Sequence, residues 1–265
     1  MDGGKTLAIL FLHIAIFIQD VYSDADNNIE NRILGGHKVS IKDYPYQVHI
    51  TAEKNGKKYQ CGGSILTYKH IITAAHCVKG REKVMVRAGV SSLKESTKDE
   101  PSMPGIYVYH PNYNDSTSDY DIAIIELTNN NITYTPKKQP TTLPKSGTEV
   151  RAGTNTTVSG WGYIKPNGPY SNDLRAVTLK VYPLQYCAIY YGSLVTERHI
   201  CAGSDEPDQN SCQGDAGGPL VITSDKVQVG VVSGGLGCES RVPKIYTNLA
   251  YGGIRDFISK YTGGS

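Results

Sequence analysis

The sequence lacks a strong net charge, a long hydrophobic run beyond its first residues, and a cysteine pattern typical of metal sites. Its 265 residues carry a formal charge of only +2 at pH 7, so we expect no strong attraction to nucleic acid or anionic lipid. No stretch after residue 18 is long and apolar enough to span a bilayer. The six cysteines include no CxxC pair and do not cluster with histidines, which argues against zinc. We therefore expect no nucleic-acid partner, no membrane span, no metal and no cofactor.

The first residues have the pattern of a secretory signal peptide. Residues 7–18 (LAILFLHIAIFI) are nearly all apolar and follow a short polar start that carries one lysine. This run suits the apolar region of a signal peptide and is short for a membrane span. A buried helix is the alternative, but the polar segment DADNNIEN that follows favours secretion. Because Ser23 is small and can end the signal, we predict a signal peptide over residues 1–23 and a secreted, extracellular protein.

Secretion changes what the cysteines indicate. An even number of cysteines in an exported chain indicates disulfides, although the sequence alone does not choose the pairs. Three glycosylation sequons begin at Asn114, Asn131 and Asn155, which agrees with the same compartment. The six cysteines are Cys61, Cys77, Cys187, Cys201, Cys212 and Cys238.

Short strand-like runs recur along the chain and are separated by Gly, Pro, Asn and Asp. Several are rich in β-branched or aromatic residues, and some alternate in polarity, which predicts an all-β sandwich or barrel. Helical spacing of apolar residues is scarce and is clearest at 253–261. The strand-like runs lie at 46–51, 84–87, 106–109, 123–127, 176–181 and 227–233.

Three motifs carry residues typical of nucleophilic catalysis. ITAAHC contains His76, DYDIAIIEL contains Asp121, and NSCQGDAGGPL contains Ala216 within a glycine-rich loop. A lone histidine, aspartate or glycine-rich loop is weak evidence. The three together occur in the order His, Asp, nucleophile loop, which points to one catalytic constellation.

At these motifs the chain resembles the trypsin/chymotrypsin family of serine proteases. The resemblance covers Ile33 to about the C-terminus and implies two six-stranded β-barrels with the active site between them, followed by a C-terminal helix. It implies an activation propeptide at 24–32 and a protease domain at 33–265. It also implies the disulfides Cys61–Cys77, Cys187–Cys201 and Cys212–Cys238. Further matching motifs are RILGG at 32–36, CGGSIL at 61–66, HPNYN at 110–114, SGWG at 159–162 and IYTNL at 245–249.

The resemblance assigns roles to the two polar members of the constellation. His76 is expected to be the general base, and Asp121 to hold its tautomer and stabilise the imidazolium. Asp119 lies nearby, but Asp121 has the family's DIA context. Ser233 matches the serine that supports the buried aspartate in this family.

The activation machinery is implied in the same way. Cleavage after Arg32 would free the amino group of Ile33, which would pair with Asp215. The backbone N–H groups of Gly214 and Ala216 would form an oxyanion hole, which needs no side chain.

The nucleophile itself is missing, because alanine has no oxygen that could attack a carbonyl. The specificity pocket also departs from the family. Asn210 is neutral where trypsin-like members have an aspartate, and Gly234, before Gly235, replaces a tryptophan that flanks the substrate. Lys244 replaces a glycine, so its four-carbon stem should obstruct the pocket or displace its wall, unless it points to solvent. These changes accompany Ala216 at one site.

A natural loss of catalysis explains all these changes, whereas a single introduced Ser→Ala substitution explains only Ala216. We therefore predict a catalytically inactive homologue. The alternatives are an active serine endopeptidase that carries an introduced Ser→Ala change, and an enzyme with altered chemistry.

Loss of chemistry with retention of the fold suggests a binding function. The pattern resembles the inactive protease paralogues of the scabies mite that are related to the group 3 mite allergens. This resemblance implies contact with host plasma and interference with complement, so complement components are candidate partners of a monomer. The 19 tyrosines against 3 phenylalanines would suit an exposed binding patch, although strands also use tyrosine readily. The tyrosine pairs are Tyr44/Tyr46, Tyr107/Tyr109 and Tyr190/Tyr191.

Overall fold

The computed structural model describes one compact unit within residues 32–265. The predicted signal peptide, the predicted propeptide and the bond between Arg32 and Ile33 lie outside the described residues. None of the described helices is long and apolar enough to cross a membrane. The described residues are 36–129, 131–164, 168–206, 210–238 and 242–263.

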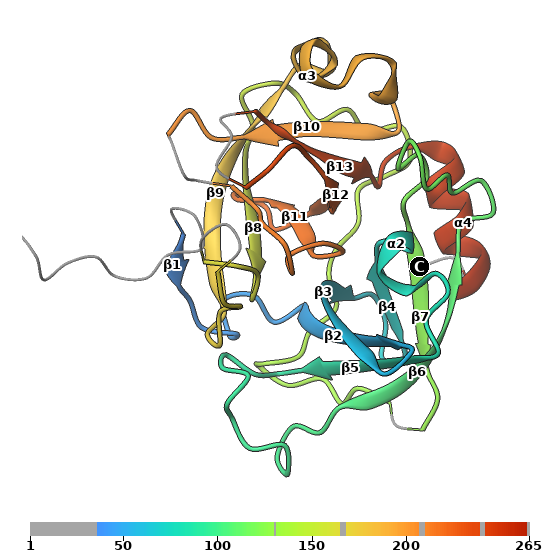
Figure 1. The fold of residues 1–265 in the computed structure, drawn as a ribbon, viewed down its shortest axis with the longest axis vertical. Coiled ribbons are helices and arrows are strands. Elements are labelled where there is room, and N and C mark those ends of the chain that lie inside the picture. The colour runs from blue at the N-terminus through green and yellow to red at the C-terminus, as the bar shows by residue number, and fades with distance from the viewer. Residues whose placement is uncertain (1–35, 130, 165–167, 207–209, 239–241, 264–265) are drawn as a thin grey trace, which may run out of the picture. The chain divides into compact units, whose positions relative to one another are not determined.

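The first half of the chain forms a closed barrel of six antiparallel strands (Figure 1). The strand order around the barrel is β2-β3-β4-β7-β6-β5, and β5 closes the barrel against β2. Its strands are β2 (Gln47–Lys54), β3 (Lys57–Ile65), β4 (His70–Thr73), β5 (Lys83–Ala88), β6 (Met103–Tyr109) and β7 (Ala123–Leu127).

The second half repeats this architecture, and its strands run from yellow to red in Figure 1. The order is β9-β10-β13-β12-β11-β8, and pairing of β8 with β9 closes the barrel. A two-residue strand, β1 (His37–Lys38), pairs with Arg175 and Ala176 at the start of β9. The prediction of two six-stranded barrels is therefore confirmed. The strands are β8 (Asn155–Gly160), β9 (Arg175–Tyr182), β10 (His199–Gly203), β11 (Pro219–Ile222), β12 (Gln228–Gly234) and β13 (Lys244–Asn248).

The strands form because alternate residues can be buried in a barrel. In β9, Val177, Leu179 and Val181 are buried while Thr178 and Lys180 are exposed, as expected for side chains that alternate between the two faces of a sheet. Each barrel has its own apolar core, and isoleucines of β3, β4 and β7 supply much of the first. Every strand-like run read from the sequence overlaps an observed strand.

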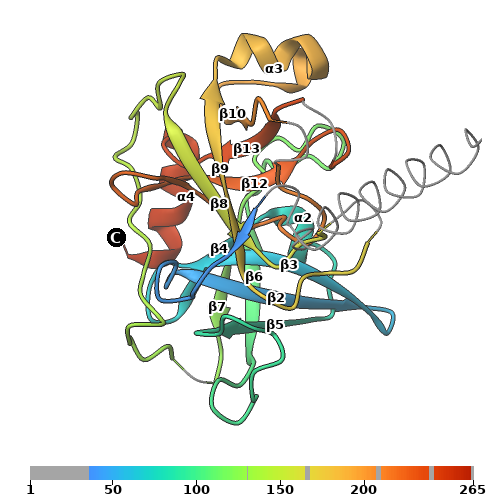
Figure 2. The ribbon, with the colours of Figure 1, turned by 90° about the vertical axis from the view of Figure 1, so that its left-hand side faces the viewer.

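The described helices are few and short. α2 (Ala75–Val78) follows β4, and α3 (Leu184–Tyr191) continues into a 3₁₀ turn over Gly192–Leu194. The predicted C-terminal helix is confirmed as α4 (Gly252–Thr262). Figure 2 shows α4 at the side of the barrels. Although α4 follows the second barrel in the chain, its buried side chains Ile254, Phe257 and Ile258 belong to the core of the first.

The three disulfides join the predicted pairs. Cys61–Cys77 links β3 to α2, Cys187–Cys201 links α3 to β10, and Cys212–Cys238 links the loops before β11 and after β12. Each closes a loop of 14 to 26 residues, which stabilises the fold by restricting the unfolded chain.

Candidate functional site

His76 and Asp121 face each other where the two barrels meet. His76 lies on α2, and Asp121 precedes β7. His76 Nδ1 lies 2.7 Å from Asp121 Oδ2, and the His76 backbone N–H donates to Asp121 Oδ1 at 3.0 Å. The aspartate is fully buried, whereas the histidine side chain is 36% exposed. In the sequence these two residues lie in separate motifs, and the fold places their side chains in direct contact.

The second barrel holds the aspartate from the other side. Ser233 Oγ, at the end of β12, donates to Asp121 Oδ2 at 2.6 Å. Thr247 Oγ1 of β13 donates to the Asp121 carbonyl at 2.8 Å, a contact that the motifs did not indicate. Asp119 instead pairs with Arg198 Nε at 2.6 Å, so it is not the partner of the histidine.

The aspartate also sets the protonation of the histidine. Burial lowers the pKa of His76, but the charge of Asp121 and its hydrogen bond raise it, and the net pKa lies above the ordinary value. A carboxylate that receives Nδ1–H leaves Nε2 as the basic nitrogen of a neutral ring. The pair can therefore accept a proton at Nε2 and stabilise the resulting cation.

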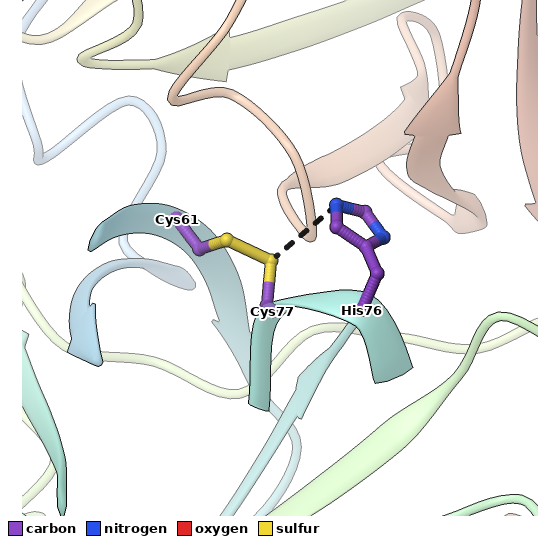
Figure 3. A group of neighbouring side chains, drawn as sticks. All are labelled: Cys61, His76 and Cys77. Carbon is purple, nitrogen blue, oxygen red and sulfur yellow. Dashed lines mark hydrogen bonds between the residues drawn. A yellow bond between two sulfur atoms is a disulfide. The ribbon is translucent and has the colours of Figure 1, made fainter. Parts of the chain in front are cut away.

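The nucleophile loop lies next to this histidine. Cys77 Sγ lies 3.8 Å from His76 Nε2 and 3.6 Å from the carbonyl oxygen of Ala216. Figure 3 shows the histidine ring beside the Cys61–Cys77 disulfide. Because both sulfurs are in the disulfide, they carry no thiolate, so this cluster cannot act as a thiolate metal site.

Ala216 is fixed by a contact between the barrels. Its carbonyl oxygen accepts a 2.7 Å hydrogen bond from the Gly62 N–H of β3. Gly214, two residues earlier, has φ of +94°, a conformation that glycine adopts without strain. Within the described residues, the N–H groups of Gly214 and Ala216 donate no hydrogen bond to another protein group. Both remain available for a bound oxygen, as an oxyanion hole requires.

Asp215 is a buried carboxylate behind this loop. It is 1% exposed and accepts hydrogen bonds from the N–H groups of Gly162 at 2.9 Å and Cys212 at 3.0 Å. Burial raises the pKa of Asp215 to about 6, although both hydrogen bonds act in the opposite direction. A positive group placed here would stabilise the carboxylate, which is the role expected for the Ile33 amino group. Ile33 itself lies outside the described residues.

Comparison with known proteins identifies the family. Residues 33–258 match the Trypsin family model. The chain belongs to the trypsin family. It is 36% identical over 236 residues to Trypsin 5G1 of Aedes aegypti, covering 88% of this chain and 85% of that protein. It is 36% identical over 231 residues to a trypsin of Simulium vittatum, covering 85% and 92%.

More distant relatives show the same family. Duodenase-1 of Bos taurus is 32% identical over 220 residues, which cover 83% of this chain and 85% of that protein. A solved structure described as "Structure of GrC" superposes with a TM-score of 0.79 at 30% identity, covering 86% of this chain and 99% of that one. The trypsin-like fold therefore extends over nearly the whole described chain.

The predicted specificity pocket contains a buried lysine. Lys244 is only 4% exposed, so it does not point to solvent. Its Nζ donates to the carbonyl oxygens of Leu236, at 3.0 Å, and Gly237. Its stem lies so close to Gly235 that a Cβ atom there would overlap Lys244 Cδ. The lysine therefore occupies part of the pocket and leaves a cavity of about 160 Å³.

The other predicted pocket residues are placed differently. Gly234 and Gly235 line the cavity together with Lys244, but Asn210 does not. The Asn210 side chain is buried and donates weakly, at 3.4 Å, to the Val242 carbonyl. The Asn210 amide is therefore engaged with the backbone and not with the cavity.

Sequence reasoning missed Tyr191 as part of this pocket. Its hydroxyl donates to the Pro243 carbonyl at 2.8 Å and accepts from the Leu236 N–H at 3.2 Å. It thereby joins the end of α3 to both sides of the Lys244 pocket. The tyrosine pair at 190–191 was the only signal, and it suggested a surface patch.

Proposed function

We propose that this chain is a secreted trypsin homologue that does not cleave peptides and instead binds other proteins. The observation that carries the proposal is Ala216, which stands at the nucleophile position beside His76. A methyl group has no oxygen with which to form an acyl-enzyme. In a comparable protease, loss of the serine costs about six orders of magnitude in turnover. The His76–Asp121 hydrogen bond, the N–H groups of Gly214 and Ala216, unpaired within the described residues, and the burial of Asp215 agree with the roles proposed for them, but this machinery would have no nucleophile to activate.

The pocket supports the same proposal independently. Trypsin-like specificity for Lys or Arg needs an anion in the pocket, whereas here the buried side chain is the cationic Lys244 and Asn210 is neutral. A substrate lysine or arginine would meet a like charge and a partly filled cavity. One introduced Ser→Ala change does not account for this second alteration.

The exposed surface offers a place for a protein partner. α3 contains no charged residue and exposes Tyr186, Ile189 and Tyr190, with Leu194 just beyond. Contiguous apolar surface of this kind is typical of interaction sites. Tyr190 therefore contributes to this exposed surface, whereas Tyr191 is partly buried and Tyr46 of the 44–46 pair is buried.

The sequence features at the N-terminus complete the proposal. We propose a signal peptide at 1–23, a propeptide at 24–32 and a secreted, monomeric protein. The three disulfides agree with an oxidising compartment. On the resemblance to the inactive mite paralogues, host complement components are the candidate partners.

The test restores the nucleophile. The unmodified chain and an Ala216→Ser variant, both cleaved after Arg32, are assayed with peptide libraries and a fluorophosphonate probe. We expect no labelling and no cleavage by the unmodified chain. The variant should react with the small probe, which does not need the pocket, and should cleave peptides poorly.

Each other outcome has a definite meaning. Rapid peptide cleavage by Ala216→Ser would support an active protease with an introduced substitution. Cleavage by the unmodified chain, repeated after removal of contaminating proteases with a serine-protease inhibitor, would contradict the proposal. An Ala216→Val variant serves as the matched control, since it changes the same side chain without adding an oxygen.

A further inference from the structure

The Lys244 pocket contains a buried ammonium group with an unused hydrogen-bond donor. An ammonium has three donors, and two of them bind the Leu236 and Gly237 carbonyl oxygens. Among the described residues the third has no protein acceptor, and Lys244 takes part in none of their ion pairs. Burial lowers the pKa of Lys244 to about 8, so the group is still mostly charged at neutral pH. A bound anion would relieve this unfavourable burial of a charge.

The pocket has room beside this ammonium. Gly234, Gly235 and Gly237 line it without side chains. A Cβ atom at Gly234 or Gly237 would meet nothing within 4 Å, so the wall is open at these two residues. The remaining volume of about 160 Å³ accommodates a short side chain.

Two segments near the pocket expose apolar side chains. Leu236, whose carbonyl binds the ammonium, is 53% exposed, and Ile189 of α3 is 73% exposed. Tyr191 connects these two segments through its hydrogen bonds to the backbone of Leu236 and Pro243. These two segments therefore offer exposed apolar surface near the Lys244 pocket.

We propose that this pocket binds the carboxylate of an aspartate or glutamate side chain in an extended segment of a partner protein. Lys244 Nζ forms the ion pair, and Leu236 with the exposed face of α3 contacts apolar residues that flank the acidic one. A charge-assisted hydrogen bond in a water-poor pocket is stronger than one at the surface. The like charge of Lys244 also disfavours lysine and arginine. In naming a protein as the ligand, this inference rests on the proposed binding function.

The experiment measures binding of end-blocked peptides with one aspartate between apolar residues, and of the same peptides with asparagine in its place. We expect the full chain to bind the aspartate peptide at least about tenfold more tightly. Lys244→Met removes the charge but keeps a long side chain, and it should abolish this preference. Lys260→Met, which removes an exposed lysine on α4, should leave the preference intact.

A second measurement uses the unmodified chain, so it does not require a substituted protein to fold. Carbodiimide coupling of the bound aspartate peptide should form an amide with Lys244, identified by mass spectrometry after digestion. Equal affinity for both peptides, or coupling only to exposed lysines, would overturn the inference.

The outcomes separate this inference from the proposed function. Cleavage of the peptides by the unmodified chain contradicts the proposed function. The preference for a carboxylate is still tested by the affinities of the aspartate and asparagine peptides. A protein partner that binds equally well to the Lys244→Met variant supports the proposed function but refutes the pocket as its site.

Discussion

The stem of Lys244 lies against Gly235, so that a Cβ atom at this glycine would overlap Lys244 Cδ. Gly235 directly follows β12, and Lys244 begins β13. The position of each residue depends on the other. Gly235 leaves the space that the lysine fills, and the lysine reaches the carbonyl oxygens beyond it. The pocket wall has thus accommodated the lysine rather than exposing it.

Gly235→Ala should therefore destabilise the protein through Lys244. We expect a loss of about 1–3 kcal/mol in the free energy of unfolding, as for other overpacked sites, measured by chemical denaturation. In a Lys244→Ala background the same substitution should cost much less. Gly234→Ala is the matched control, because a Cβ atom there meets nothing within 4 Å. Equal losses with and without the lysine would refute this coupling.

Asp121→Asn should lower the pKa of His76. The carboxylate raises this pKa through its charge and its hydrogen bond, and the substitution removes the charge that stabilises the protonated ring. The measurement is an NMR titration of the histidine rings. Asp119→Asn is the control, since Asp119 pairs with Arg198. An unchanged His76 titration in Asp121→Asn would show that the pair is not formed in solution.

The motifs predicted which residues meet at the site. Once the fold is inferred, each motif has a known place on the backbone. Asp121 was chosen over Asp119 on its local context, and the hydrogen bonds agree with that choice. Side-chain direction was less predictable. Whether Lys244 points inward depends on two carbonyl oxygens in the loop that precedes β13, and the direction of Asn210 depends on the Val242 carbonyl. No local pattern encodes such contacts between distant segments.

Stability of the uncleaved chain should depend on pH through Asp215. Its pKa is raised in the folded protein from 3.8 to about 6, so the charged form costs stability. This cost, about 3 kcal/mol, is fully present above pH 6 and disappears as the pH falls toward 3.8. The difference in unfolding free energy between the unmodified chain and Asp215→Asn should change by this amount between pH 8 and pH 4, in favour of the unmodified chain at low pH.

Cleavage after Arg32 should reverse the pH dependence of stability if the Ile33 amino group pairs with Asp215. An opposite charge lowers the pKa of a carboxyl group, so the charged form of Asp215 would then add stability. The same measurement on the cleaved chain tests this. Asp225→Asn, at an exposed aspartate, is the control for general effects of charge. A flat difference between pH 8 and pH 4 in the uncleaved chain would contradict the burial of an unpaired charge at Asp215.

Removal of Lys244 should make a restored nucleophile productive. Ala216→Ser returns the missing oxygen beside His76, but the substrate pocket still holds the ammonium. The double variant Ala216→Ser/Lys244→Gly should therefore cleave peptides after uncharged side chains at least about tenfold faster than Ala216→Ser alone, since each 1.4 kcal/mol of transition-state binding regained is a factor of ten. Because Asn210 is neutral, we expect cleavage after uncharged side chains rather than after lysine or arginine.

The measurement is kcat/KM on a peptide library, with Ala216→Ser/Lys260→Met as control. Equal rates for all three variants would show that the lysine does not limit substrate access, and that the proposed loss of catalysis rests on residue 216 alone.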